Sequence, residues 1–243
     1  MAYQLITVEY PRAGVAQITM NRPERRNALS IQMREELYQA LQEERVNDDV
    51  RVVIFTGAGP CFSSGFDLSE FGKPERLDDL INSSAKFYRA LWYYPKATIA
   101  AVDGPALAGG LDLLVFCDIR LCTEASVFGH PQVKFGGVPI YTPLRWIVGD
   151  TAARSLCLRG NYIDAQEALR IGLVGEVVPA DGHLPRALEI AEEIMEAPPE
   201  SLAFSKAYMQ RSPDSSFDTS FYFEHDDSFR RRMEVIVRNR ERS

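Results

Sequence analysis

Two uninterrupted apolar runs constrain the fold of this 243-residue chain more than any other feature. Residues 51–56 read RVVIFT and residues 98–102 read TIAAV. A strand that is apolar on both faces is typical of a sheet with helices on either side. The first run ends at residues 57–60 (GAGP) and the second at residues 103–105 (DGP). The two runs therefore predict buried strands that each pass into a glycine-containing turn.

Strand and helix patterns alternate around these runs. Residues 3–10 and 15–20, separated by the turn residues 11–14 (PRAG), predict a hairpin. Ser30 can cap a helix with apolar side chains at i, i+4 and i+8 spacing on one face. These side chains are Met33, Leu37 and Leu41.

The second half of the chain continues this alternation and then becomes helical. The elements predicted there are a helix over 109–117, a strand over 119–122, a helix capped by Asp164 and Glu167 that ends near Gly172, and a strand over 174–178. Beyond about residue 184 the pattern is helical, with breaks at Pro198-Pro199 and Ser212-Pro213. The order of elements predicts an α/β core with a C-terminal helical portion.

Composition and charge exclude several classes of function. The net charge of −7 gives no basic surface for nucleic acid. The N-terminal residues lack a basic region followed by an apolar run, and no apolar stretch approaches the length of a membrane span. We therefore predict a cytoplasmic protein that binds neither nucleic acid nor membrane. The spacing of cysteine and histidine predicts no metal site and buried, inert thiols at Cys61, Cys117, Cys122 and Cys157.

The two glycine-containing turns are the strongest candidates for a binding site. Residues 61–68 (CFSSGFDL) and 104–112 (GPALAGGLD) each follow a predicted strand, and the second opens a helix. Unpaired N–H groups at a helix start can stabilise an anion or a developing oxyanion. The alternative is that both segments are tight turns with close packing, which their spacing alone favours. Neither segment carries a dinucleotide, P-loop or GxSxG signature.

Several segments, taken in order, resemble the crotonase (enoyl-CoA hydratase/isomerase) superfamily. They are residues 21–29 (NRPERRNAL), 62–68 (FSSGFDL), 102–110 (VDGPALAGG), 117–120 (CDIR), 128–131 (FGHP) and 168–179 (ALRIGLVGEVVP). The resemblance spans roughly residues 5–180. It implies a β-β-α spiral core over residues 1–185 that binds acyl-CoA, and a helical trimerisation portion over 186–243. It also implies a homotrimer or homohexamer without a cofactor, since coenzyme A is part of the substrate.

The same resemblance assigns roles to individual residues. It implies that the N–H groups of Phe66 and Gly109 form an oxyanion hole for the thioester carbonyl. It places the remaining candidate substrate- and CoA-binding residues at Arg26, Ala28, Ser64, Asp67, Leu68, Leu107, Gly110 and Tyr141. Asp67 has a simpler interpretation as a local cap, and Arg26 as a solvated side chain.

The acid/base residues are where the chain departs from the family. The family's two glutamates correspond here to Asp112, one turn after Gly109, and to Gln132. A carboxylate beside a thioester can act as general base or acid, whereas an amide cannot exchange a proton at neutral pH. The shortened segment 136–143 brings Ile140 and Tyr141 towards the acyl pocket. His130 or Tyr141 can replace the missing carboxylate, although a structural histidine is the simpler interpretation.

Three functions follow from this pattern. The first is an enoyl-CoA hydratase-like enzyme that stabilises a thioester enolate. The second is a one-base enoyl-CoA isomerase, and the third is a catalytically weak acyl-CoA-binding protein.

The segment 221–227 (FYFEHDD) lacks the family's usual C-terminal motif, and the arginines at 230–232, 238, 240 and 242 predict a solvated helix face.

Overall fold

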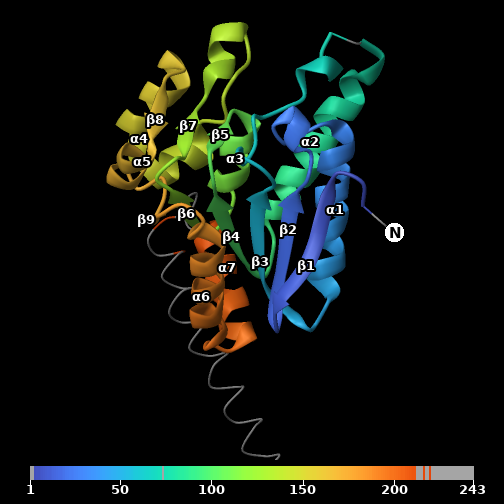
Figure 1. Cartoon of the computed structure of the whole chain (residues 1–243), viewed down its shortest axis with the longest axis vertical. Helices are drawn as coiled ribbons and strands as arrows, with labels where there is room; N and C mark the ends of the chain where they lie inside the picture. Colours follow the sequence, from blue (N-terminus) through green and yellow to red (C-terminus); the bar gives the residue numbers. More distant parts are fainter. Residues whose placement is uncertain (1–2, 73, 212–215, 217–218, 220–243) are drawn as a thin grey trace, which may run out of the picture.

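The computed structural model describes residues 3–72, 74–211, 216 and 219 of the chain (Figure 1). Predictions for the break at Ser212-Pro213, the segment 221–227 and the C-terminal arginines lie outside these residues. Within the described part, no helix combines the length and the apolar character needed to cross a membrane.

Two sheets form the framework. The larger sheet contains, in spatial order, β1 (Ile6–Arg12), β2 (Gly14–Met20), β3 (Val50–Gly57), β4 (Ala97–Val102), β6 (Ile119–Thr123) and β9 (Glu176–Val178). Only β1 runs antiparallel to its neighbour, and the other strands are parallel. The smaller sheet contains β5 (Pro105–Leu107), β7 (Val127–Gly129) and β8 (Tyr162–Asp164). The predicted strands are therefore all present, although the hairpin strands extend into the expected turn.

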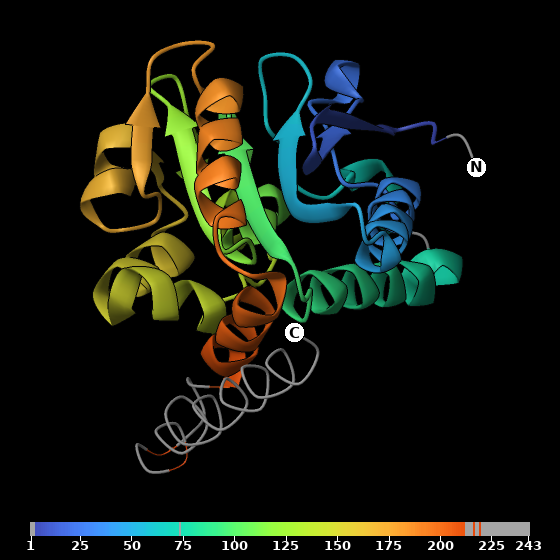
Figure 2. The ribbon, with the colours of Figure 1, turned by 90° about the horizontal axis from the view of Figure 1, so that it is seen from below.

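Helices cover both faces of the larger sheet, as the apolar runs predict. On β3, Val52 and Ile54 pack with α6 (His183–Met195), which lies across the strands in Figure 2. The alternate residues Val53 and Phe55 pack in the cluster that contains the apolar face of α1 (Ile31–Val46). Successive side chains of a strand point to opposite faces, so a run without polar residues is buried on both. This alternation explains why residues 52–55 (VVIF) contain no polar residue.

The helix ends follow the predicted capping chemistry. The Ser30 hydroxyl accepts a hydrogen bond from the Met33 N–H at 3.2 Å, and the Asp164 carboxylate accepts one from the Glu167 N–H at 2.8 Å. The Asp164 cap starts α5 (Ala165–Arg170). After α6, the chain passes Pro198 and enters α7 (Pro199–Arg211), at the predicted break. The proposed division of the chain at residue 185 stays a prediction.

Two long helices escaped the sequence analysis. They are α2 (Leu77–Trp92) and α4 (Thr142–Arg159), and α4 contains a kink at Gly149. In α2 the buried residues Ser83, Phe87 and Leu91 recur at intervals of four, which is a helical signal. The remaining helix, α3 (Gly109–Val115), begins at the predicted residue and ends two residues early. All four cysteines are free and buried, as predicted.

Candidate active site

The two glycine-containing turns lie against each other at the ends of β3 and β4. The Ser63 N–H donates to the Pro105 carbonyl at 3.1 Å, and the Leu107 N–H donates to the Ser63 carbonyl at 2.9 Å. These bonds form a short parallel bridge between Ser63 and Ala106. The segment after β3 is thus held beside β5, which leads directly into α3.

Glycine at two positions permits this close approach. Gly65 has φ +94°, and a Cβ there would lie 2.8 Å from the Ala108 Cβ and 3.1 Å from the Gly109 N. At Gly110 a Cβ would lie 2.5 Å from the Ser63 carbonyl oxygen. Both distances are too short for a side chain, so the backbones meet only because glycine has no Cβ. Ala108 between them has φ +50°, a conformation that costs energy in a non-glycine residue.

The N–H groups of Phe66 and Gly109 lie in this region of contact. Neither N–H donates a hydrogen bond to another of the described residues. Gly109 is the first residue of α3, where an N–H has no partner within the helix. Its carbonyl accepts a hydrogen bond from the buried Tyr88 hydroxyl at 2.9 Å. The site therefore offers two backbone donors from two different segments of the chain.

Asp112 follows one turn later on α3 and is buried. Its side chain is 8% exposed, and burial raises the pKa of its carboxyl well above the usual range. One carboxylate oxygen, Oδ1, lies 3.8 Å from Nε2 of His130. The ionisable groups of Tyr88 and Cys157 have raised pKa values, from burial first and from the Asp112 charge second. The first turn of α3 therefore carries a buried carboxyl group whose protonated form is favoured.

His130 and Gln132 form a pair next to Asp112. Nε2 of the Gln132 amide lies 3.1 Å from Nδ1 of His130. With the amide as donor, the neutral ring carries its proton on Nε2, facing Asp112. His130 is fully buried, and burial lowers the pKa of its ring to about 4. Its Nε2 and the Gln132 Oε1 are buried without a hydrogen-bond partner among the described residues.

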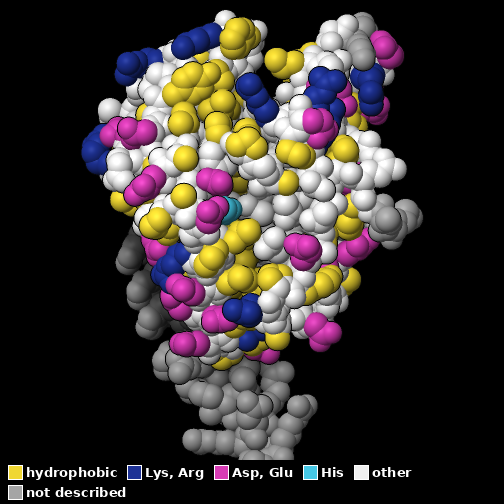
Figure 3. All heavy atoms as spheres, in the orientation of Figure 1, with side chains coloured by type: hydrophobic (Ala, Val, Ile, Leu, Met, Phe, Trp, Pro, Cys, Tyr) yellow, Lys and Arg dark blue, Asp and Glu magenta, His cyan; other side chains and the backbone are white. Residues whose placement is uncertain are grey.

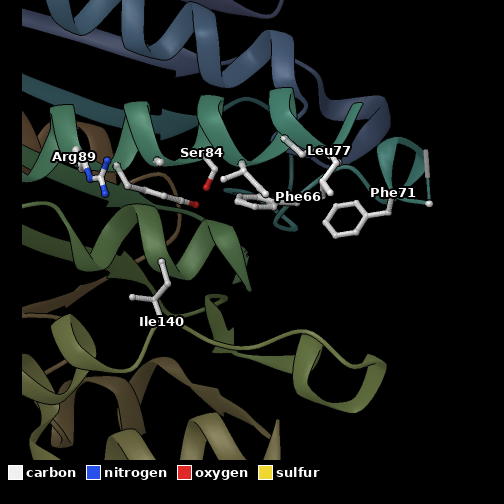
Figure 4. A pocket seen from close by; sticks show the side chains of 11 residues that line it. Phe66, Phe71, Leu77, Ser84, Arg89 and Ile140 are labelled. Atoms are coloured by element: carbon white, nitrogen blue, oxygen red, sulfur yellow. The ribbon is translucent and has the colours of Figure 1, made fainter. Parts of the chain in front are cut away.

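A cavity of about 740 Å³ lies beside Phe66 and Tyr88 and runs along α2. The labelled side chains in Figure 4 extend from Phe71 to Arg89, with Ile140 on the opposite side and Phe66 between them. The other lining residues are Gly72, Leu77, Leu80, Ile81, Ser84, Ala85 and Tyr88. In the space-filling view, the surface is hollowed between the start of α2 and the loop that precedes α4 (Figure 3). The lining is mostly apolar and includes Phe66, the residue that carries one of the two backbone donors.

The other residues predicted for the site fall into two groups. Ala28 is buried, Ser64 and Leu107 are half-buried, and Gly110 packs on Ser63. Arg26 and Leu68 are exposed, and Leu68 is 76% accessible.

Asp67 and Tyr141 have partners of their own. The Asp67 carboxylate accepts from the Ser69 N–H at 3.0 Å and pairs with Arg22 at 2.6 Å. Burial opposes its ionisation, yet these bonds lower the pKa of Asp67 to about 2. It thus forms the local cap that the sequence suggested. The Tyr141 hydroxyl donates to Asp150 on α4, and Ile140 rather than Tyr141 lines the cavity.

Similarity to known proteins identifies the family. A family model described as Enoyl-CoA hydratase/isomerase matches residues 11–230. The chain belongs to this family. A short-chain-enoyl-CoA hydratase of Clostridium acetobutylicum is 35% identical over 218 residues, which are 86% of this chain and 83% of that protein. The crystal structure of an enoyl-CoA hydratase from Bacillus anthracis has a TM-score of 0.89 at 30% identity and covers 98% of this chain and 97% of its own. Pseudomonas aeruginosa DspI has a TM-score of 0.89 at 29% identity, covering 95% and 96%.

The family membership confirms the crotonase-like α/β fold and makes the protein an enzyme of the hydratase/isomerase family that processes acyl-CoA. Within the described part of the chain, no three His, Cys, Asp or Glu side chains come close enough to hold a metal ion. Sequence reasoning did not find Tyr88 or the cavity, because α2 was not predicted. The four-residue spacing of its buried residues would have indicated the helix.

Proposed function

We propose that the protein binds an enoyl-CoA with its thioester oxygen between the N–H groups of Phe66 and Gly109. Two unpaired backbone donors from touching segments are the single observation that carries this proposal. Negative charge moves onto that oxygen when the enolate forms, and two preorganised donors stabilise it. Loss of one such donor typically costs about 3–4 kcal/mol of activation free energy.

Asp112 is the proposed proton carrier. Its carboxylate takes a proton from water as the oxygen of that water attacks Cβ, and the resulting enolate then receives the proton at Cα from the same carboxyl group. The raised pKa of Asp112 suits this role, because a group that is readily protonated can both accept and return a proton. This reaction is an enoyl-CoA hydration with a single carboxyl group.

Double-bond isomerisation is the second candidate, and Gln132 favours it. The Gln132 amide cannot transfer a proton, so no second acid is supplied at the position of the family's other glutamate. In a 3-enoyl-CoA, Asp112 would remove a proton from Cα, and the dienolate would receive it at Cγ. No water is added, and the double bond moves into conjugation with the thioester.

The acyl group would occupy the cavity along α2. At ~30 Å³ per water molecule, its 740 Å³ corresponds to roughly 25 waters, more than a four-carbon acyl group fills. We therefore propose a longer apolar acyl chain as the preferred substrate. Coenzyme A enters as part of that substrate, without a separate cofactor, and the active protein is a cytoplasmic homotrimer or homohexamer.

The test measures hydration of 2-enoyl-CoA and isomerisation of 3-enoyl-CoA thioesters by the wild type and three variants. Asp112→Asn keeps the shape of the side chain but removes the proton carrier, so kcat should fall by roughly 10²–10⁴-fold. Gln132→Glu supplies a second carboxyl group and should increase hydration relative to isomerisation. Glu44→Gln is the control, because Glu44 is a buried carboxylate that hydrogen-bonds Tyr10 outside the site.

Each outcome has a distinct meaning. Full turnover by Asp112→Asn would remove Asp112 from the mechanism. Thioester binding without turnover of any substrate by the wild type would instead identify a catalytically weak acyl-CoA-binding protein.

A further inference from the structure

Arg34 is a buried cation without a carboxylate partner among the described residues. It lies in the first turn of α1 and is 0% exposed. Its Nε and Nη2 both donate to the Ser83 hydroxyl, at 3.1 and 2.9 Å, and its Nη1 donates to the Leu29 carbonyl. Burial lowers the pKa of Arg34, whereas Tyr88 and the carboxylates of Glu70 and Glu35 favour its charge from beyond ion-pair distance. Burying a charge without an ion-pair partner is costly. The site described above does not explain why an arginine is kept here.

A series of hydrogen-bonded peptide groups begins at this guanidinium. The Leu29 carbonyl that accepts from Arg34 belongs to the same peptide group as the Ser30 N–H. The Ser30 N–H donates to the Ala28 carbonyl at 2.9 Å. The charge of Arg34 is therefore connected, through one peptide group, to the peptide group between Ala28 and Leu29.

The series continues to the proposed oxyanion donor. The N–H of the next peptide group belongs to Leu29 and donates to the Gly65 carbonyl at 2.8 Å. That carbonyl belongs to the peptide group whose N–H is the N–H of Phe66. Three peptide groups, hydrogen-bonded in sequence, thus connect the guanidinium of Arg34 to the Phe66 N–H.

Such a series strengthens its last donor. A hydrogen bond accepted by a carbonyl polarises its peptide group and makes the N–H a better donor, by about 10–30% for each bond. A cation at the start of the series adds to this polarisation, and low local dielectric preserves the effect. The Phe66 N–H would therefore bind a developing oxyanion more strongly than an ordinary backbone amide.

Arg34 also contacts the side chain of the same residue. Its Cζ lies 4.5 Å from the centroid of the Phe66 ring, and the Tyr88 ring stacks near that ring at 6.3 Å between centroids. The residue is therefore held through its ring as well as through its backbone.

We propose that Arg34 is a positioning residue that polarises the Phe66 N–H through these peptide groups and holds Phe66 in place. The inference rests on the proposed function, since it requires that this N–H receive the thioester oxygen. The acyl-CoA need not touch Arg34 itself.

The experiment compares wild type, Arg34→Lys, Arg34→Met and Arg34→Gln. The lysine keeps the charge, the methionine keeps an unbranched apolar chain, and the glutamine keeps a neutral donor. The probe is octanoyl-CoA with a ¹³C-labelled carbonyl, which cannot be hydrated, and its carbonyl stretching frequency is measured when bound. Turnover of a 2-enoyl-CoA by the same proteins gives kcat and KM.

The uncharged variants should lose part of the frequency shift, less than about half, because the Gly109 N–H is unaffected. Their kcat should be up to about tenfold lower (about 1.4 kcal/mol of activation free energy) with KM nearly unchanged. Arg34→Lys should keep most of the shift. Lys86→Met is the matched control. The substitution removes the cation of Lys86, which also lies between α1 and α2. Lys86 pairs with Glu35 at 2.6 Å and contacts the Tyr38 ring, and it is not part of the series of peptide groups.

Two results would overturn the inference. One is an unchanged frequency shift in the uncharged variants, and the other is a higher kcat in Arg34→Met than in Arg34→Lys, as packing alone would give. If Arg34→Met does not fold, Arg34→Gln takes its place in that comparison. Octanoyl-CoA that binds the wild type with no shift would instead refute the oxyanion hole itself, and so the proposed function.

Discussion

Gly65→Ala should separate the two proposed oxyanion donors without altering any acid/base residue. The new methyl group would lie 2.8 Å from the Ala108 Cβ, whereas ordinary contacts begin at 3.4 Å, so the segments would have to move apart by about 0.6 Å. Overpacking of this kind costs about 1–3 kcal/mol, and the positive φ of Gly65 adds about 1–2 kcal/mol. The free energy of unfolding should fall by about 2–5 kcal/mol.

Activity should fall by more than the loss of stability explains. A misplacement approaching 1 Å can cost roughly 10²-fold in rate, because both N–H groups must reach the same oxygen atom. We expect kcat per folded molecule to decrease by about that factor. Urea denaturation gives the folded fraction, and turnover of a 2-enoyl-CoA gives the rate.

Gly172→Ala is the matched control for backbone strain. Gly172 has φ +78°, and a Cβ there meets only the Ile147 carbonyl oxygen, at an ordinary 3.8 Å. This variant should lose about 1–2 kcal/mol of stability and keep the wild-type kcat. The reasoning would be refuted if folded Gly65→Ala turned over as fast as folded Gly172→Ala.

Two further predictions concern the buried acid and the cavity. Because the pKa of Asp112 is raised, the folded state binds more protons than the unfolded state between about pH 3.9 and the pKa of the folded state. The free energy of unfolding of the wild type therefore falls as pH rises through this window. Asp112→Asn should therefore stabilise the protein more at pH 7.5 than at pH 4.5 in urea denaturation, and an equal difference at both would contradict this. Ser84→Trp should fill part of the cavity and lower kcat/KM for long-chain enoyl-CoA by roughly fourfold per displaced methylene, at ~0.8 kcal/mol each. The four-carbon substrate should be unaffected, and equal losses for all chain lengths would argue against this location of the acyl group.

Local features of the fold were predictable because neighbouring residues determine them. The burial of β3 on both faces follows from its apolar composition, and the caps at Ser30 and Asp164 follow from side chains that reach N–H groups three residues away. The two glycine turns and the absence of a second carboxylate at Gln132 were also visible. The functions of the turns needed the family resemblance, since their spacing alone favoured tight packing.

Other features required contacts between distant parts of the chain. His130 was interpreted as structural, but its ring lies next to Asp112, 18 positions earlier, with an unpaired Nε2. Tyr141 was expected near the acyl pocket, and its hydroxyl instead donates to Asp150 on α4. Both outcomes depend on side-chain contacts that short-range patterns do not encode.

The sequence by itself determined the buried strands, the capped helices, the glycines that allow close approach and the types of acid/base groups available. Only the tertiary structure decided that Gly65 and Gly109 touch, that Asp112 is withdrawn from water, and that Arg34 connects to Phe66 through three peptide groups. The physical reason is that propensity and capping act over a few residues. Desolvation, cavity shape and hydrogen bonding between segments arise only when the strands and helices have packed.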